Sequence, residues 1–255
     1  MKGLDQKLSQ TASDASGERS GGAAAPIRVA LFGARGRMGT KLVEALAEDR
    51  ACSLVASIDR DDPLPAAADV VIDFSSPEGS KRALEAAKAV SAALLVGTTG
   101  LDDGFRRALE DAAKRMPILV ASNTSLGVAV MHRMVAMAVR GLGSGWRVQL
   151  EEIHHARKVD APSGTALALA STVESAGGAL SRDRIVSIRQ GEVVGTHRIE
   201  FTSPVERLVL VHEALDRALF ARGAVVLARW LHRQPPGMHS VQAWLQERLD
   251  EGTRS

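Results

Sequence analysis

Two adjacent histidines, a lysine and a Ser-Gly-Thr turn lie close together in the second half of the chain. His154 and Lys158 are four residues apart, so they can share one face of an extended or a helical segment. Histidine titrates near neutral pH and can donate a proton, while a neighbouring lysine adds a positive charge and a second donor. These residue types favour proton delivery to an anionic substrate, with His154 and Lys158 as the catalytic candidates.

A turn that follows this pair indicates an anion site. Pro162 disfavours helix at the residue before it, and Ser163 can cap a helix that begins at Gly164 and Thr165. Backbone N–H groups at the start of a helix attract anions. A capped polar loop is the ordinary explanation of any one such residue, but here proton donors, a cation and an anion site converge.

The hydrophobic pattern predicts the elements that position this cluster. Residues 149–153 before it indicate the end of a strand and residues 166–173 after it a helix, so we expect the cluster in a strand-to-helix loop, where α/β proteins keep their chemistry. In the first half, strands are expected at 27–32, 53–58, 69–74, 92–96 and 118–121, with helices at 40–48, 80–90, 102–115 and 126–142. This alternation predicts a Rossmann-like, doubly wound parallel sheet.

The pattern changes from residue 147. Strands are expected at 147–153, 185–189, 195–202 and 207–212, and helices at 164–176, 216–232 and 239–249. Strands that alternate apolar and polar residues suit a sheet with one covered face. We therefore expect an α+β domain with a mixed sheet at 126–213, a dinucleotide-binding domain at 26–125, and C-terminal helices at 214–250 that return to the first domain.

A glycine turn after the first strand predicts a dinucleotide site. Gly33, Gly36 and Gly39 follow a strand and precede a helix, where glycines let the backbone approach a pyrophosphate and the helix N-terminus stabilises its charge. Arg35 and Arg37 are candidates for further phosphate contacts. The expected cofactors are NADH and/or NADPH.

Two further strand ends suit the rest of such a cofactor. Asp59 ends the second strand and is placed to accept the ribose hydroxyls, and Arg60 beside it suits a 2′-phosphate. A solvated acidic turn is the alternative, given Asp61 and Asp62. The small residues of the GTTG segment at 97–100 permit close approach of a flat nicotinamide ring.

Bulk properties exclude several classes of function. The 255 residues carry a formal net charge of +2, 3% aromatic residues and no Tyr, which argues against nucleic-acid and membrane attraction. No apolar run approaches the roughly 20 residues that span a bilayer. The lone Cys52 allows no internal disulfide and suits a reducing compartment, and the histidine spacing predicts no metal. Residues 1–25 are expected to form a disordered tail without a secretory signal, and the location to be cytoplasmic.

Several motifs together resemble one family. They are GARGRMG at 33–39, VIDFSSPEG at 71–79, GTTG at 97–100, ASNTSLGV at 121–128, EIHHARKVDAPSGTA at 152–166 and GEVVGTHRIEF at 191–201. The chain resembles the 4-hydroxy-tetrahydrodipicolinate reductase (dihydrodipicolinate reductase) family of the diaminopimelate and lysine pathway, over both halves and in the family's order.

The resemblance implies an activity and a role for each matching residue. It implies NAD(P)H-dependent reduction of a small cyclic dicarboxylate, 4-hydroxy-tetrahydrodipicolinate, to tetrahydrodipicolinate, with a proton from His154 assisted by Lys158. It further implies substrate contacts from His155, Ser163, Gly164 and Thr165, and a homotetramer built through the substrate-domain sheet. The implied nucleotide-binding positions are Gly33, Ala34, Arg35, Gly36, Arg37, Met38, Asp59, Arg60, Gly97, Thr98, Thr99, Ala121, Ser122, Asn123 and Thr124.

The chain departs from the family's pattern in two shortened segments. One is residues 61–68, and the other lies before Gly191 and after the helix that begins at Gly164. The first bears on the adenosine side of the cofactor site. Two other functions are kept open: another NAD(P)-dependent amino-acid or imino-acid dehydrogenase, and a non-catalytic protein that senses dinucleotides.

Overall fold

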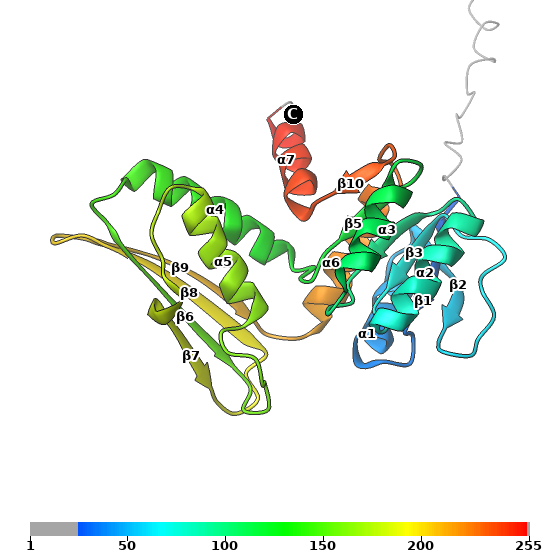
Figure 1. The fold of residues 1–255 in the computed structure, drawn as a ribbon, viewed down its shortest axis with the longest axis horizontal. Helices are drawn as coiled ribbons and strands as arrows, with labels where there is room; N and C mark the ends of the chain where they lie inside the picture. Colours follow the sequence, from blue (N-terminus) through cyan, green and yellow to red (C-terminus); the bar gives the residue numbers. More distant parts are fainter. Residues whose placement is uncertain (1–24, 254–255) are drawn as a thin grey trace, which may run out of the picture.

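Residues 25–253, which the computed structural model describes, fold around two sheets (Figure 1). The first sheet has six strands in the order β10-β5-β4-β3-β1-β2, and every neighbouring pair is parallel. Its strands are β1 (Ile27–Phe32), β2 (Cys52–Ile58), β3 (Val70–Asp73), β4 (Ala93–Val96), β5 (Pro117–Val120) and β10 (Gly237–His239). The predicted doubly wound parallel sheet is confirmed.

Helices cover both faces of this sheet. The core on one face takes side chains from α1 (Arg37–Glu48), α6 (Ala218–Leu231) and α7 (Val241–Gly252). The core on the other face takes them from α2 (Pro77–Ala89) and α3 (Asp103–Ala113). Strands buried on both faces are apolar along their whole length, as in the fully buried β4.

The second sheet in the described residues has four strands in the order β7-β6-β8-β9. Its strands are β6 (Arg147–His154), β7 (Ile185–Arg189), β8 (Gly195–Thr202) and β9 (Arg207–Ala214), with a short 3-10 turn, η1 (Arg182–Arg184), before β7. β6 pairs in parallel with β7 and antiparallel with β8, so the predicted mixed sheet is confirmed. Helices α4 (Leu126–Leu142) and α5 (Gly164–Ser175) pack on one face, and no helix of residues 25–253 covers the opposite face (Figure 1).

The structure corrects several predicted boundaries. Helix α1 begins at Arg37 rather than at residue 40, because Gly36 serves as its N-cap and the glycine motif continues into its first turn. Helix α2 begins at Pro77 rather than at residue 80, since the Ser76 side chain accepts a hydrogen bond from the Gly79 N–H and proline suits the first helical position. Strand β10 was not predicted; its three residues are too short to carry a pattern.

One boundary matters for the site. β6 continues through His154, which pairs in register with Arg189 of β7, so the first histidine lies on a strand and not in the predicted loop. The predicted tail at 1–25 lies outside the described residues except for Ala25. Within residues 25–253, no helix has the length and apolar character needed to cross a membrane.

Candidate active site

A cavity of about 810 Å³ separates the carboxyl ends of the first sheet from the helix-covered side of the second. All six residues predicted for catalysis and substrate binding line it: His154, His155, Lys158, Ser163, Gly164 and Thr165. Seven predicted cofactor residues line it as well: Met38, Gly97, Thr99, Ala121, Ser122, Asn123 and Thr124. The remaining predicted cofactor residues, Gly33, Ala34, Arg35, Gly36, Arg37, Asp59, Arg60 and Thr98, lie outside its wall.

The glycine turn lies where the strand order reverses, between β1 and β3, the place where open α/β sheets bind ligands. Gly33 has a φ of 80°, and a side chain there would overlap the carbonyl of Phe74. No side chain caps α1, so its first N–H groups remain available to an anion. A dinucleotide pyrophosphate requires a glycine turn that its phosphates can approach closely and free N–H groups at the start of a helix. These residues provide both, so they fit the cofactor.

The loop after β2, predicted to bind the adenosine ribose, is held by a cluster of ion pairs. The Asp59 carboxylate accepts a hydrogen bond from the Arg35 N–H at 3.3 Å, and the Arg35 guanidinium lies 3.3 Å from Asp62. Arg82, which sequence reasoning missed, donates to the carbonyls of Asp59 at 2.9 Å, Asp62 at 2.7 Å and Arg60. The side chain of Arg60 is exposed. The predicted ribose-binding loop is therefore fixed by α2, the helix that carries Arg82.

The part of the site predicted to border the nicotinamide is built from the ends of β3, β4 and β5. The hydroxyl of Thr98 accepts from the Ser75 N–H at 3.0 Å, and Gly97 packs directly on the ring of Phe74. Buried Asp73 accepts hydrogen bonds from the hydroxyls of Ser75 and Ser80. Burial raises the pKa of the Asp73 carboxyl, and these hydroxyls oppose the rise.

One hydrogen bond joins the two predicted halves of the site. The Asn123 amide donates to the hydroxyl of Thr165 at 2.9 Å, and its carbonyl oxygen accepts from the Ser125 N–H at 2.8 Å. Asn123 was predicted for the cofactor and Thr165 for the substrate. Thr124 instead directs its hydroxyl to the carbonyl of Phe220 at 2.7 Å, which ties the loop after β5 to α6.

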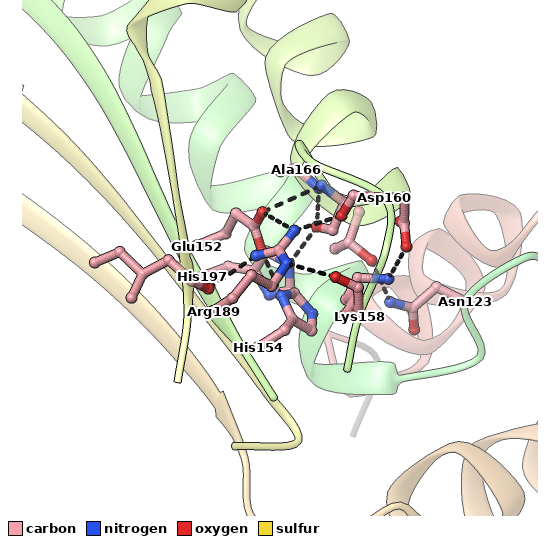
Figure 2. A network of polar contacts seen from close by, with 11 residues as sticks. Asn123, Glu152, His154, Lys158, Asp160, Ala166, Arg189 and His197 are labelled. Carbon is pink, nitrogen blue, oxygen red and sulfur yellow. Dashed lines mark hydrogen bonds and ion pairs between the residues drawn. The ribbon is translucent and has the colours of Figure 1, made fainter. Parts of the chain in front are cut away.

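His154 lies against a buried carboxylate. Its Nδ1 contacts Oε2 of Glu152, and its ring meets the ring of His197 edge to face with 5.2 Å between centroids (Figure 2). Burial lowers the pKa of His154, and the hydrogen bond and charge of Glu152 oppose that shift without cancelling it. Burial lowers the pKa of His197 to about 3, so His197 is neutral at physiological pH.

Lys158 and His155 face the same cavity from the loop after β6. The Lys158 ammonium lies 2.7 Å from a carboxylate oxygen of Asp160, a partner that sequence reasoning did not name (Figure 2). The Nδ1 atom of His155 is buried with no hydrogen-bond partner among the described residues. Burial, with the charges of Arg217 and Arg157, lowers the pKa of His155.

The start of α5, where an anion site was predicted, lies on the cavity wall. The Ser163 hydroxyl accepts from the Ala166 N–H at 3.2 Å and lies 3.3 Å from Nε2 of His197. A Cβ added to Gly164 would meet no atom within 4 Å, so the backbone there borders open space. This end of α5 can therefore receive a carboxylate from the cavity.

Sequence reasoning missed Glu152, Arg189 and His197 as parts of the site. A signal for Glu152 was present, because residues two apart on a strand point to the same side and Glu152 precedes His154 by two. The other two depend on strand pairing: Arg189 lies opposite His154 on β7, and His197 lies opposite Glu152 on β8. Among residues 25–253, no three His, Cys, Asp or Glu side chains gather in a way that could hold a metal ion.

Both halves of the chain match known proteins. A family model described as "Dihydrodipicolinate reductase, N-terminus" matches residues 27–124, and one described as "Dihydrodipicolinate reductase, C-terminus" matches residues 127–245. The 4-hydroxy-tetrahydrodipicolinate reductase of Stenotrophomonas maltophilia (strain R551-3) is 40% identical over 239 residues, which cover 87% of this chain and 98% of that protein. The enzyme of the same name from Campylobacter jejuni (serotype O:6) is 36% identical and covers 86% of this chain and 99% of its own.

Solved structures support the fold. A dipicolinate-bound dihydrodipicolinate reductase from Paenisporosarcina sp. TG-14 superposes with a TM-score of 0.73 at 22% identity, over 85% of this chain and 98% of that one. An engineered D-amino acid dehydrogenase bound to NADP+ gives 0.52 at 14% identity, over 86% of this chain and 94% of that one. Two family models that together span both sheets, and relatives aligned over nearly their whole length, show that the chain belongs to the dihydrodipicolinate reductase family.

Proposed function

We propose that the chain catalyses the NAD(P)H-dependent reduction of 4-hydroxy-tetrahydrodipicolinate to tetrahydrodipicolinate, a step of diaminopimelate and lysine biosynthesis. The observation that carries the proposal is one cavity lined by His154, Lys158, the open start of α5 and the nicotinamide-side loops. The reaction consumes the hydroxy substrate, NAD(P)H and one proton, and yields the reduced ring, NAD(P)+ and one water. Loss of the 4-hydroxyl as that water leaves a conjugated ring imine as the hydride acceptor.

Bound NAD(P)H supplies the hydride. The turn at Gly33 and the uncapped start of α1 would hold its pyrophosphate, and Asp59 would accept hydrogen bonds from the adenosine ribose. Gly97 and Thr99, at the end of β4, would border the nicotinamide ring. With these placements, the hydride would enter from the edge of the cavity at the end of β4.

The chain's own residues hold the dicarboxylate against that edge. One carboxylate is received by the backbone N–H groups of Gly164 and Thr165, beside the Lys158 ammonium. The Lys158 ammonium and the imidazole of His155 both line the cavity and suit an anionic ring. Fixing two reactants in this geometry contributes on the order of 7–11 kcal/mol of barrier reduction in well-oriented systems.

His154 supplies the proton. When the hydride adds to one ring carbon, negative charge develops on the adjoining atoms and a proton must follow. Because Nδ1 of His154 is engaged by Glu152, Nε2 is the ring nitrogen that delivers it. Lys158 assists as a second donor and as a positive charge beside the developing anion.

The assay that tests the proposal follows NADH and NADPH oxidation at the nicotinamide absorbance band. The substrate is generated in situ by the preceding synthase from pyruvate and aspartate semialdehyde. Wild type should oxidise the cofactor, and His154→Ala and Lys158→Ala should each lose about 10²–10⁴-fold in kcat, the usual contribution of a general acid. Cofactor binding without oxidation by wild type would instead favour a dinucleotide-sensing protein or another imine substrate.

The proposal extends to the organisation of the chain. It assigns residues 26–125 and 214–250 to cofactor binding and residues 126–213 to substrate binding and assembly. It also places the reaction in the cytoplasm, where the reduced cofactors are made and a thiol such as that of Cys52 stays reduced.

The assembly proposed is a homotetramer formed through the helix-free face of the second sheet. Val186 and Val211 on this face are 53% and 59% exposed, and Ile153 and Ile188 beside them are half-buried. Apolar side chains on a bare sheet face suit a partner sheet. Light scattering should give four times the chain mass, and Val211→Glu should reduce it; a monomeric wild type would contradict the assembly.

A further inference from the structure

A buried carboxylate that was not predicted for the site lies directly behind the proton donor. Glu152 is 0% exposed and has three partners: His154 Nδ1 on its Oε2, and the Arg189 guanidinium at 2.8 Å and the Ser163 N–H at 3.3 Å on its Oε1 (Figure 2). A buried charge is costly unless it is paired and hydrogen-bonded. Glu152 meets that requirement through partners on three elements around the cavity: His154 on β6, Arg189 on β7 and Ser163 at the start of α5.

We propose that Glu152 is a positioning residue for the reaction: it orients His154, holds its proton on Nδ1 so that Nε2 faces the cavity, and stabilises the imidazolium form, while Arg189 keeps Glu152 ionised. The inference depends on the proposed function for its catalytic meaning, and on the contacts alone for the orientation of the ring.

The strand geometry sets the orientation. Glu152 and His154 project from the same side of β6, because they are two residues apart on one strand. An ionised carboxylate only accepts hydrogen bonds, so the Nδ1 that contacts it carries a hydrogen. The other ring nitrogen, Nε2, lies beside Gly195 of β8, where the absence of a side chain leaves room for it.

Arg189 decides where the proton resides. Burial raises the pKa of Glu152, but hydrogen bonds to its carboxylate, the largest from Arg189, outweigh burial and keep that pKa below its ordinary value. Glu152 therefore stays ionised, and the shared proton stays on the imidazole. Without the guanidinium, the same buried carboxyl would compete with His154 for that proton.

Four charged or titratable groups face His154 from the elements around it: Glu152 on β6, Lys158 in the following loop, Arg189 on β7 and His197 on β8. Burial, Lys158 and Arg189 lower the pKa of His154, and the hydrogen bond and charge of Glu152 raise it. Removing the charge of Glu152 should therefore lower the pKa of His154 further, because burial, Lys158 and Arg189 then act without opposition. A reaction that needs protonated His154 will then lose activity at lower pH than in wild type.

The same pair anchors the loop that carries Lys158. The Arg189 guanidinium donates to the carbonyl of Lys158 at 3.2 Å and to the carbonyl of Asp160. Glu152 in turn holds the N–H of Ser163, the N-cap of α5. Proton donor, lysine loop and anion site are therefore fixed to one another through two side chains.

The test compares Glu152→Gln, which keeps the size of the side chain and removes its charge, with Glu192→Gln as the matched control. Glu192 is also a carboxylate paired with an arginine, Arg157 at 2.7 Å, but both side chains are about three-quarters exposed. Three quantities are measured: kcat against pH, NADH affinity, and the tautomer and protonation of His154 by NMR of ¹⁵N-labelled imidazole nitrogens.

We expect Glu152→Gln to lower kcat by about 10²-fold or more, by the scale of general-acid effects. The alkaline limb of its kcat profile should move to lower pH, the Nδ1–H form should no longer dominate for His154, and NADH affinity should stay at the wild-type value. Glu192→Gln should match wild type in all three. A Glu152→Gln variant with wild-type rate and pH limb, or with lost activity but an unchanged limb and tautomer, would overturn the proposal.

Failure of the proposed function gives a different result. If wild type shows no turnover with the expected substrate, the NMR comparison still decides whether Glu152 fixes the tautomer of His154. Should Glu152→Gln not fold, Glu152→Asp keeps the charge and withdraws it by one methylene. The alkaline limb of the kcat profile should then move to lower pH by less than is expected for Glu152→Gln. A folded Glu152→Asp variant with an unmoved alkaline limb would also count against the proposal.

Discussion

Gly195→Ala tests whether Nε2 of His154 is the reacting nitrogen. Gly195 starts β8 and directly precedes Thr196, which pairs with Ile153 as the last pair of the antiparallel register, so Gly195 lies next to His154 at the end of β6. A Cβ added there would lie 2.9 Å from Nε2 and 3.2 Å from Cδ2 of His154. Carbon and nitrogen atoms pack at about 3.5 Å or more, so the ring or the strand must move by roughly half an ångström.

The size of the effect follows from this overlap. The ring cannot swing away at no cost, because Glu152 engages its other nitrogen. A 1 Å misplacement at a reacting centre costs about 10²-fold in rate, or about 2.7 kcal/mol of barrier. Half of that displacement corresponds to about 1.4 kcal/mol, so the expected loss in kcat is about 10-fold. Overpacking of this kind lowers the free energy of unfolding by about 1–3 kcal/mol.

The assay is cofactor oxidation with the in situ substrate, with thermal unfolding measured in parallel. Gly145→Ala is the matched control in the same half of the chain, since a Cβ there meets no atom within 4 Å. The control should keep wild-type kcat. A folded Gly195→Ala variant with wild-type kcat and pH profile would refute the assignment of Nε2 as the proton-delivering atom.

Three further predictions concern other parts of the molecule. Asn123→Ala removes the hydrogen bond to Thr165 and should weaken transition-state binding by about 1 kcal/mol. We expect a roughly fivefold fall in kcat/KM with little change in melting temperature. An unchanged kcat/KM would show that this hydrogen bond does not join the two halves of the site. Gly39→Ala places a Cβ on the carbonyl of Gly33, so both the melting temperature and NADH affinity should fall, and normal values of both would contradict the close packing of α1 on β1. Burial raises the pKa of Cys52 to about 11, so a disulfide reagent at pH 8 should label it only after denaturation; rapid labelling of the folded protein would show the thiol is accessible.

Local signals in the chain were sufficient for the elements and for part of the site. Apolar runs bounded by glycine and polar turns predicted both sheets, and helix α4 begins and ends at the predicted residues. The cap at Ser163 and the glycine turn at Gly33 were also predictable, because both depend on neighbours a few residues away. The proximity of His154 to Lys158 followed from their spacing alone.

Helix starts were less well predicted. Arg37 and Pro77 each begin a helix three residues before the expected start. In both helices the apolar residues that predicted the helix begin after its first hydrogen-bonded turn. The first turn of a helix packs less on the core, so its residues carry less of the apolar pattern. The Ser76-Pro77 pair carried the missing signal, a cap followed by proline at the first helical position.

What the sequence by itself determined about this protein is therefore its family, its two sheets and a set of residues that line one cavity. The partners of those residues were decided by tertiary structure. Glu152 meets Arg189, 37 residues away, and Asn123 meets Thr165, 42 residues away. Such contacts depend on which strands become neighbours and in which register, and a pattern of period two along one strand does not specify the strand beside it.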